Sequence, residues 1–223
     1  MTQDKVTQDK DVSTMRRAYQ TGALDENGLA PDWLTQFDHW LAEAVESGMF
    51  REPNAMVVAT ATPDGRPSAR TVLLKAYDEN GLVFYSNYES RKGHELAANP
   101  HVCCVFSWVA LERQVIVEGT VERTNREDSA AYFASRPHGS RLGALVSPQS
   151  RVVASRAELD DAWAAALSRY PEGSQVPLPD HWGGFRVVPS TVEFWQGRHD
   201  RLHDRLRYRR APDERWVVER LAP

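Results

Sequence analysis

The chain has 223 residues, of which 41% are hydrophobic and 26% charged, so it can bury a substantial core as one large domain. Its formal net charge of −4 argues against broad binding to nucleic acid or membranes, and this makes any local group of arginines informative. No apolar run approaches the roughly 20 residues that span a bilayer, and the N-terminus lacks an apolar signal core. We therefore expect a cytoplasmic protein.

The first 14 residues are polar and repeat the sequence Thr-Gln-Asp-Lys, so they are predicted to be a disordered tail before a single domain of residues 15–223. A helix is expected next. Asp32 can cap it, apolar residues recur at helical spacing from Trp33 to Val45, and Gly48 can end it.

Short strand patterns separated by turn residues begin at residue 56. The expected strands cover 56–62, 68–77, 82–86, 102–109 and 114–123, with a short helix capped by Ser90 between the third and the fourth. Helices are expected at 126–134 and after the capping box of Ser155 and Glu158, where one apolar face would hold Leu159, Trp163, Ala166, Leu167 and Tyr170. Strands return at 185–188, 191–195, 206–209 and 216–219.

This order of elements favours a mainly β fold, a closed antiparallel barrel with α additions. A parallel nucleotide-binding sheet is disfavoured, because the sequence has no Gly-rich turn from strand to helix. Cys103 and Cys104 are the two cysteines and are adjacent. A disulfide between neighbours is strained, so we expect reduced thiols in or near the core rather than a redox site.

The segment 194–205 combines aromatic and basic side chains. In an extended backbone, Arg201, His203 and Arg205 would point the same way and the two aspartates of the segment the other way. Three cationic or near-cationic groups on one face repel each other unless an anion lies among them. With the aromatic pair Phe194-Trp195 just upstream, the segment predicts a site for a flat, phosphorylated ligand.

Other basic residues permit two interpretations each. Ser90, Arg91 and Lys92 open a helix, where free N–H groups attract an anion, but a solvated first turn fits as well. Arg70 and Lys75 stand five apart on one predicted strand and so on opposite faces, where Lys75 by itself suits a surface position.

A third group recurs at four-residue spacing. Tyr132, Arg136 and Ser140 can clamp a phosphate, or Tyr132 can face the core while Arg136 is a favourable cation at a helix end. The sequence shows no Ser-His-Asp arrangement, paired-carboxylate site or metal-ligand spacing. Several anion-binding groups with little acid–base machinery suggest that a bound cofactor performs the difficult step.

Taken in order and spacing, a set of motifs resembles the pyridoxamine 5′-phosphate oxidase family, also called pyridoxine 5′-phosphate oxidase, of vitamin B6 metabolism. The likeness runs from about Arg16 to Pro223. Its motifs are Arg70–Lys75, Phe84–Asn87 with Ser90–Lys92, Leu111–Val115, Tyr132–Phe133 with Ser135–Pro137, Pro177–Pro179 with Trp182–Arg186, Glu193–Gly197, Arg201–Arg205 and the ending Arg220–Pro223. Departures are few: residues 197–200 precede Arg201 where some relatives differ, and Pro148 stands before Gln149.

The resemblance implies a homodimeric, FMN-binding split β-barrel with each flavin between two subunits, and no metal. FMN contacts are implied for Arg70, Thr71, Val72, Leu73, Leu74, Lys75, Tyr85, Ser86, Arg91, Lys92, Gln114, Gln149, Ser150, Trp195 and Arg205. Substrate contacts are implied for Arg16, Tyr19, Lys75, Tyr132, Arg136, Ser140, Arg201 and His203, with Arg201 and His203 as the catalytic pair. The segment from Arg16 to Tyr19 matches one that can cover the site.

The implied reaction converts pyridoxamine 5′-phosphate and pyridoxine 5′-phosphate to pyridoxal 5′-phosphate. A hydride passes to FMN, dioxygen reoxidises the flavin and gives hydrogen peroxide, and the amine substrate also yields ammonia. Two alternatives stay open: a split-barrel oxidoreductase with another flavin or a deazaflavin, and a non-catalytic carrier of FMN or pyridoxal 5′-phosphate. The implied substrate residues argue against both.

Overall fold

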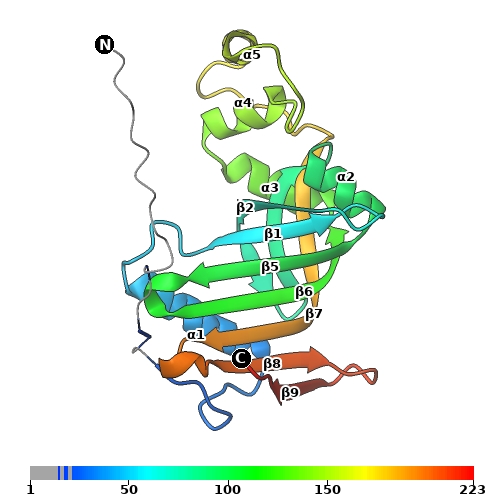
Figure 1. Cartoon of the computed structure of the whole chain (residues 1–223). Coiled ribbons are helices and arrows are strands. Elements are labelled where there is room, and N and C mark those ends of the chain that lie inside the picture. Colours follow the sequence, from blue (N-terminus) through cyan, green and yellow to red (C-terminus); the bar gives the residue numbers. More distant parts are fainter. Residues whose placement is uncertain (1–14, 16–17, 20–21) are drawn as a thin grey trace, which may run out of the picture.

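The structure, a computed structural model, describes Met15, Ala18, Tyr19 and residues 22–223. The predicted tail 1–14 and Arg16 lie outside the described residues. Within them a nine-stranded sheet carries helices at one end and behind it (Figure 1). Its strands run in the order β2 (Pro67–Leu73), β1 (Ala55–Ala61), β5 (His101–Trp108), β6 (Arg113–Arg123), β7 (Trp182–Gln196), β4 (Gly81–Asn87) and β3 (Ala76–Asp78), with β8 (Asp204–Arg210) pairing β7 and β9 (Trp216–Arg220). Every pair is antiparallel, which confirms the predicted class.

One expected strand, 68–77, is broken at residues 74–75. β2 pairs with β1, whereas β3 pairs with β4 at the other end of the strand order. The Leu74 N–H donates to the Asn54 carbonyl at 2.9 Å, and the Lys75 N–H donates to the Val83 carbonyl at 2.8 Å. The two edges of the sheet therefore meet at this break, and the sheet forms a split β-barrel. Strict alternation does not continue across the break, so the expectation that Arg70 and Lys75 occupy opposite faces of one strand is wrong.

Helix α1 (Trp33–Glu46) packs its apolar face against the sheet and lies behind β6 and β7 in Figure 1. The carboxylate of Asp32 caps its N-terminus with a 2.8 Å hydrogen bond, and Gly48 follows its end with a φ of +63°. The predicted start and stop are thus confirmed. Fully buried Phe37 meets Phe106 of β5 edge-on at 5.0 Å between ring centroids, so α1 contributes directly to the core.

The remaining helices gather near one end of the sheet (Figure 1). They are α2 (Arg91–Ala98), α3 (Arg126–Ser135), α4 (His138–Val146) and α5 (Arg156–Arg169). Helix α4 was not expected, because its Pro137 and glycines suggest a loop. A Cβ on Gly139 would lie 3.4 Å from the Trp163 ring, so the glycine allows α4 to approach α5 closely. On α5 the predicted apolar face is only partly covered, since Trp163 and Leu167 remain 38% and 41% exposed.

Strand β7 is continuous where two strands were expected. Pro189, which has no N–H to donate, lies where the β6–β7 register shifts between Glu118 and Gly119. Short 3-10 turns occur at η2 (Val109–Leu111) and η3 (His199–Arg201). Both cysteines are free, with Cys104 buried and Cys103 half-buried, as expected. Among the described residues, no helix has the length and apolar character needed to cross a membrane.

Candidate active site

A cavity of about 440 Å³ lies beside the break between β2 and β3. It collects residues from five separate parts of the chain, most of them predicted site residues. Its lining includes Thr71, Val72, Leu73, Lys75, Tyr85, Ser86, Lys92, Tyr132, Arg136, Pro137, Ser140, Gln149 and Trp182. A larger cavity of about 630 Å³, over β1, β5 and β6, contains none of the predicted residues. The smaller cavity is therefore the candidate site.

Lys92 is a buried cation on the first turn of α2, with 7% of its surface exposed. Its Nζ donates to Ser86 Oγ at 2.8 Å, to Gln149 Oε1 at 2.9 Å and to Ser90 Oγ at 3.3 Å, all neutral oxygens. Burial, followed by the charge of Arg70, lowers the pKa of Lys92 to about 8. No carboxylate pairs with this ammonium in the part of the chain that the structure describes. A buried cation without a counter-ion suits an anionic ligand.

Arg136 is a second cation without a carboxylate partner among the described residues, and it is half-buried. Its guanidinium lies over the ring of Trp182, with Cζ 4.7 Å from the centroid, and burial lowers its pKa. Its Nη1 is enclosed and has no hydrogen-bond partner among the described residues. Tyr132 stacks on Tyr85 with ring centroids 4.1 Å apart and also lines the cavity. Its side chain therefore faces the cavity, as Arg136 does, rather than the main core. Sequence reasoning gave Trp182 no role, although it lies within a matched motif.

Two predicted arginines lie next to the cavity without forming its wall. Arg70 Nη2 is 3.4 Å and Arg91 Nε 2.8 Å from the carboxylate of Glu95, a buried residue that the sequence analysis did not single out. Its four-residue spacing from Arg91 on α2 was the available signal. Leu74 is buried in the core, and Ser150 lies in an exposed turn with a φ of +72°. Their cofactor contacts stay predictions.

A second group of predicted residues lies on the outer sheet. Gln114, Trp195 and Arg205 are directly paired in register across β6, β7 and β8. Arg205 forms a bidentate ion pair with Glu193, at 2.7 and 3.0 Å. The carboxylate of Glu193, which the sequence analysis did not consider, therefore neutralises Arg205.

The extended backbone expected for 194–205 is found at its two ends, in β7 and β8, but is wrong for the turn at His199–Arg201. Asp200 and Arg201 have φ values of +56° and +63° within η3, so Arg201 stands in an exposed turn, and of the three basic residues Arg205 alone lies in a strand. His203 packs on Trp195 at 4.7 Å between ring centroids, and Tyr19 approaches it to 5.5 Å. The N–H of Arg198 donates to His203 Nδ1 at 3.1 Å, so this nitrogen acts as an acceptor.

The two groups occupy opposite ends of β7. Gly184 pairs with the cavity residue Tyr85, whereas Trp195 belongs to the second group. At about 3.3 Å per residue, the intervening strand spans roughly 35 Å. The two groups of one chain therefore lie well apart along the strand.

Comparisons with known proteins agree over nearly the whole chain. A family model described as pyridoxamine 5′-phosphate oxidase matches residues 41–196, and one described as the pyridoxine 5′-phosphate oxidase C-terminal dimerisation region matches 182–223. A pyridoxine/pyridoxamine 5′-phosphate oxidase of Streptomyces avermitilis is 57% identical over 216 residues, 96% of either chain. One of Thermobifida fusca is 54% identical over 218 residues, 96% of this chain and 98% of the other. The crystal structure of PhzG from Burkholderia lata 383, in complex with tetrahydrophenazine-1-carboxylic acid, has a TM-score of 0.85 and 28% identity, covering 93% of this chain and 100% of that one.

Proposed function

The chain belongs to the pyridoxamine 5′-phosphate oxidase family, and we propose that it oxidises pyridoxamine 5′-phosphate and pyridoxine 5′-phosphate to pyridoxal 5′-phosphate with FMN. One observation carries the proposal. Lys92, which is buried, and Arg136, which is half-buried with an enclosed and unpartnered Nη1, both line this cavity, and neither has a carboxylate partner among the described residues. An enzyme that holds a phosphorylated cofactor against a phosphorylated substrate needs two such groups.

The residues around Lys92 fit the FMN side. The ammonium lies at the N-terminus of α2, where the helix dipole adds to its attraction for a phosphate, and Ser86 and Gln149 hold it in place. Thr71, Val72 and Leu73 form the adjacent wall. The chemistry that FMN supplies when bound is acceptance of a hydride from the substrate's 4′ carbon and transfer of the two electrons to dioxygen, which is reduced to hydrogen peroxide.

Lys75, Tyr132, Arg136 and Ser140 would hold the substrate phosphate. All four line the cavity, and Trp182 fixes the plane of the Arg136 guanidinium. These residues bind and orient the substrate, so proximity supplies much of the rate.

We further propose a homodimer in which the second group comes from the partner copy. Two observations support this proposal. The two groups lie far apart along β7, and the matched dimerisation region, 182–223, includes Trp195, Arg201, His203 and Arg205. Each flavin would then lie between two subunits, with Arg201 and His203 beside the substrate ring and Tyr19 near them. Two free thiols suit a reducing compartment, and we place the enzyme in the cytoplasm.

The decisive experiment adds pyridoxamine 5′-phosphate to the purified, flavin-loaded protein under air. We expect hydrogen peroxide and pyridoxal 5′-phosphate to form together. A protein that binds FMN and pyridoxal 5′-phosphate but releases no peroxide would be a carrier. A protein that fails to bind FMN but binds a deazaflavin would instead be a split-barrel oxidoreductase with a different cofactor.

A further inference from the structure

Glu95 is a buried carboxylate at the junction of three elements next to the cavity. It belongs to α2, and 5% of its surface is exposed. Its Oε2 accepts hydrogen bonds from Thr60 of β1, from Ser68 of β2 at 2.5 Å and from Arg70 Nη2 at 3.4 Å. Its Oε1 accepts from Arg91 Nε at 2.8 Å. One side chain thus connects both arginines that border the cavity.

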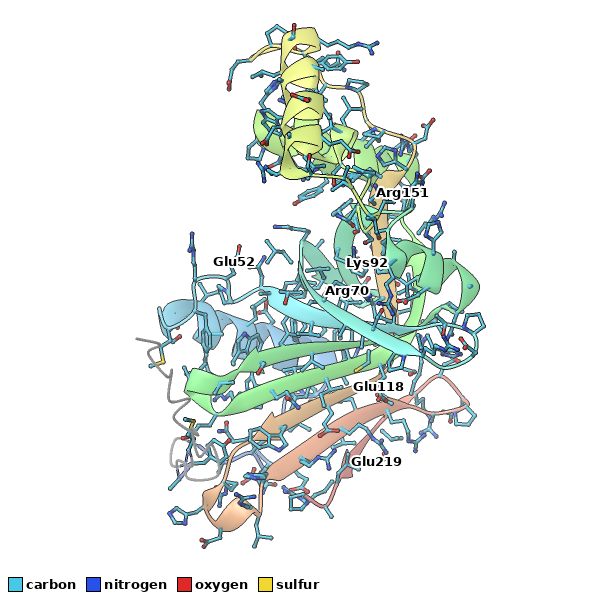
Figure 2. The ribbon with its side chains drawn as sticks, turned by 45° about the horizontal axis from the view of Figure 1, so that its top comes forward. Glu52, Arg70, Lys92, Glu118, Arg151 and Glu219 are labelled. Carbon is cyan, nitrogen blue, oxygen red and sulfur yellow. The ribbon has the colours of Figure 1, made fainter. Side chains whose placement is uncertain are left out.

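The carboxylate is charged at any ordinary pH. Burial raises the pKa of Glu95, but the hydrogen bonds from Ser68, Thr60 and Arg91 outweigh burial and lower it to about 2. The neighbouring cations are Arg70, Arg91 and Lys92, and Figure 2 shows Arg70 of β2 close to Lys92 of α2. Three positive charges and one negative charge leave a net charge of about +2, which matches the charge of about −1.5 to −2 on a phosphate monoester.

The arrangement leaves the arginines usable by a ligand. Arg91 engages Glu95 through Nε, and the side chain remains 59% exposed. Its terminal nitrogens can thus meet another acceptor while Glu95 fixes the stem. Arg70 is held more tightly, because its Nη1 also donates to Thr60 Oγ1 at 2.6 Å and to the Val58 carbonyl at 3.2 Å. Groups held in place before binding lose less entropy when a ligand arrives.

We infer that Glu95 is a positioning residue that holds Arg70 and Arg91 for the phosphate of FMN; the inference rests on the proposed function. Glu95 would not touch the flavin and would act only through the two arginines. A residue that merely ties α2 to the sheet would affect every flavin equally. A residue that orders the phosphate site affects FMN and leaves riboflavin, which has the same ring but no phosphate, nearly unchanged.

The experiment titrates FMN and riboflavin into flavin-free protein and follows quenching of flavin fluorescence. It uses the wild type, Glu95→Ala and Glu95→Gln, with Asp78→Asn as the matched control. Asp78 also pairs with an arginine across elements, Arg186 at 2.5 Å, but lies outside the cluster. Loss of a charge-assisted contact should weaken FMN binding by about tenfold in Glu95→Ala and riboflavin binding less than about twofold. Glu95→Gln, which retains one acceptor and the same shape, should fall between, and Asp78→Asn should match the wild type.

Each other outcome has a distinct meaning. Equal losses for both flavins, or an FMN affinity that is unchanged or higher, would overturn the role of Glu95 while leaving the proposed function in place. A wild type that binds FMN no better than riboflavin would remove the phosphate site, and the proposed function would fail together with the inference. If Glu95→Ala does not fold, the isosteric Glu95→Gln supplies the FMN-to-riboflavin ratio on its own.

Discussion

The guanidinium of Arg136 and the indole of Trp182 form a cation–π contact at 4.7 Å, while Arg136 Nη1 has no partner among the described residues. Trp182 is itself 5% exposed, so the aromatic surface beneath the arginine is rigid. The pair presents a positive charge at the cavity in a fixed plane. Substrate affinity should therefore depend on both residues.

Replacing Arg136 with alanine should raise KM for pyridoxamine 5′-phosphate, because a charge-assisted contact to the phosphate is lost. We expect a loss of roughly 1–3 kcal/mol in binding free energy, and a similar loss for Lys75→Ala. Steady-state kinetics measure this. Arg169→Ala is the control, because Arg169 also lies over an aromatic ring, that of Tyr170 at 5.4 Å, but outside the cavity. An unchanged KM in both Arg136→Ala and Lys75→Ala would refute the proposal that these two residues bind the substrate phosphate.

Trp182→Leu removes the aromatic surface under Arg136 and keeps a large apolar side chain. A cation–π contact of this kind contributes about 0.5–2 kcal/mol. We expect KM to rise severalfold in Trp182→Leu and to change little in Trp182→Phe. The dissociation constant of FMN should not change in either variant. A rise in KM that is as large in Trp182→Phe would show that packing, rather than the contact with the guanidinium, controls affinity.

Lys92 should make FMN binding sensitive to alkali. Burial and the charge of Arg70 lower the folded-state pKa of Lys92 to about 8 from an ordinary 10.5. FMN affinity should fall as the pH rises above about 8, because the ammonium loses its proton. Folding has the opposite sign: between these two pKa values the unfolded chain binds more protons, so the contribution of Lys92 to the stability of the ligand-free protein rises with pH.

Fluorescence titration of FMN across this pH range tests the point. In Lys92→Met, FMN should bind more weakly at neutral pH, and its affinity should no longer fall across the same range. A wild type whose affinity stays level through pH 9 would show that Lys92 does not contact an anion.

Subunit mixing tests whether each site takes residues from two chains. Arg136→Ala and Arg201→Ala alter different groups, and Arg201 is exposed, so its loss should leave the fold intact. The two impaired variants are mixed, allowed to exchange subunits and assayed at a low substrate concentration, where a raised KM lowers the rate. Half of the dimers then combine both chains. Each of these has one intact site, so about a quarter of wild-type activity should return. No recovery, with exchange verified by mass, would place both groups in one chain's site.

The core position of α1 predicts a local contrast in stability. Phe37→Ala removes a fully buried ring and should lower the free energy of unfolding by about 3–5 kcal/mol. Val45→Ala, on the same helix at a side chain 56% exposed, should change it by less than about 0.5 kcal/mol. Chemical denaturation of both variants measures the difference; equal losses would mean that α1 is not anchored through Phe37.

The sequence correctly predicted those features of the fold that depend on neighbouring residues. The caps at Asp32, Ser90 and Ser155 and the extents of β5 and β6 agree with the structure, because neighbouring residues determine them. Helix α4 was missed because Pro137 directly precedes it and its two glycines, Gly139 and Gly143, have poor helical propensity. Both glycines lie close to Trp163 of α5, a contact that the local sequence does not reveal.

Long-range arrangement explains the remaining errors. The break after β2 arises because Leu74 and Lys75 bond to different edges of the sheet, and no pattern within 68–77 reveals that. Glu95 likewise gains its importance from Thr60 and Ser68, which are distant in sequence. The resemblance to a known family supplied the cavity residues, which come from five segments and which periodicity could not have joined.

The break between β2 and β3 has a consequence for the rate at which backbone amides exchange with deuterium. A ligand that contacts Leu73 on one side of the break and Tyr85 on the other links the two edges of the barrel. Binding of the ligand and closure of the barrel at the break are then coupled equilibria. Emptying the cavity should therefore speed amide exchange first at Leu74 and Lys75, ahead of the strands in the middle of the sheet.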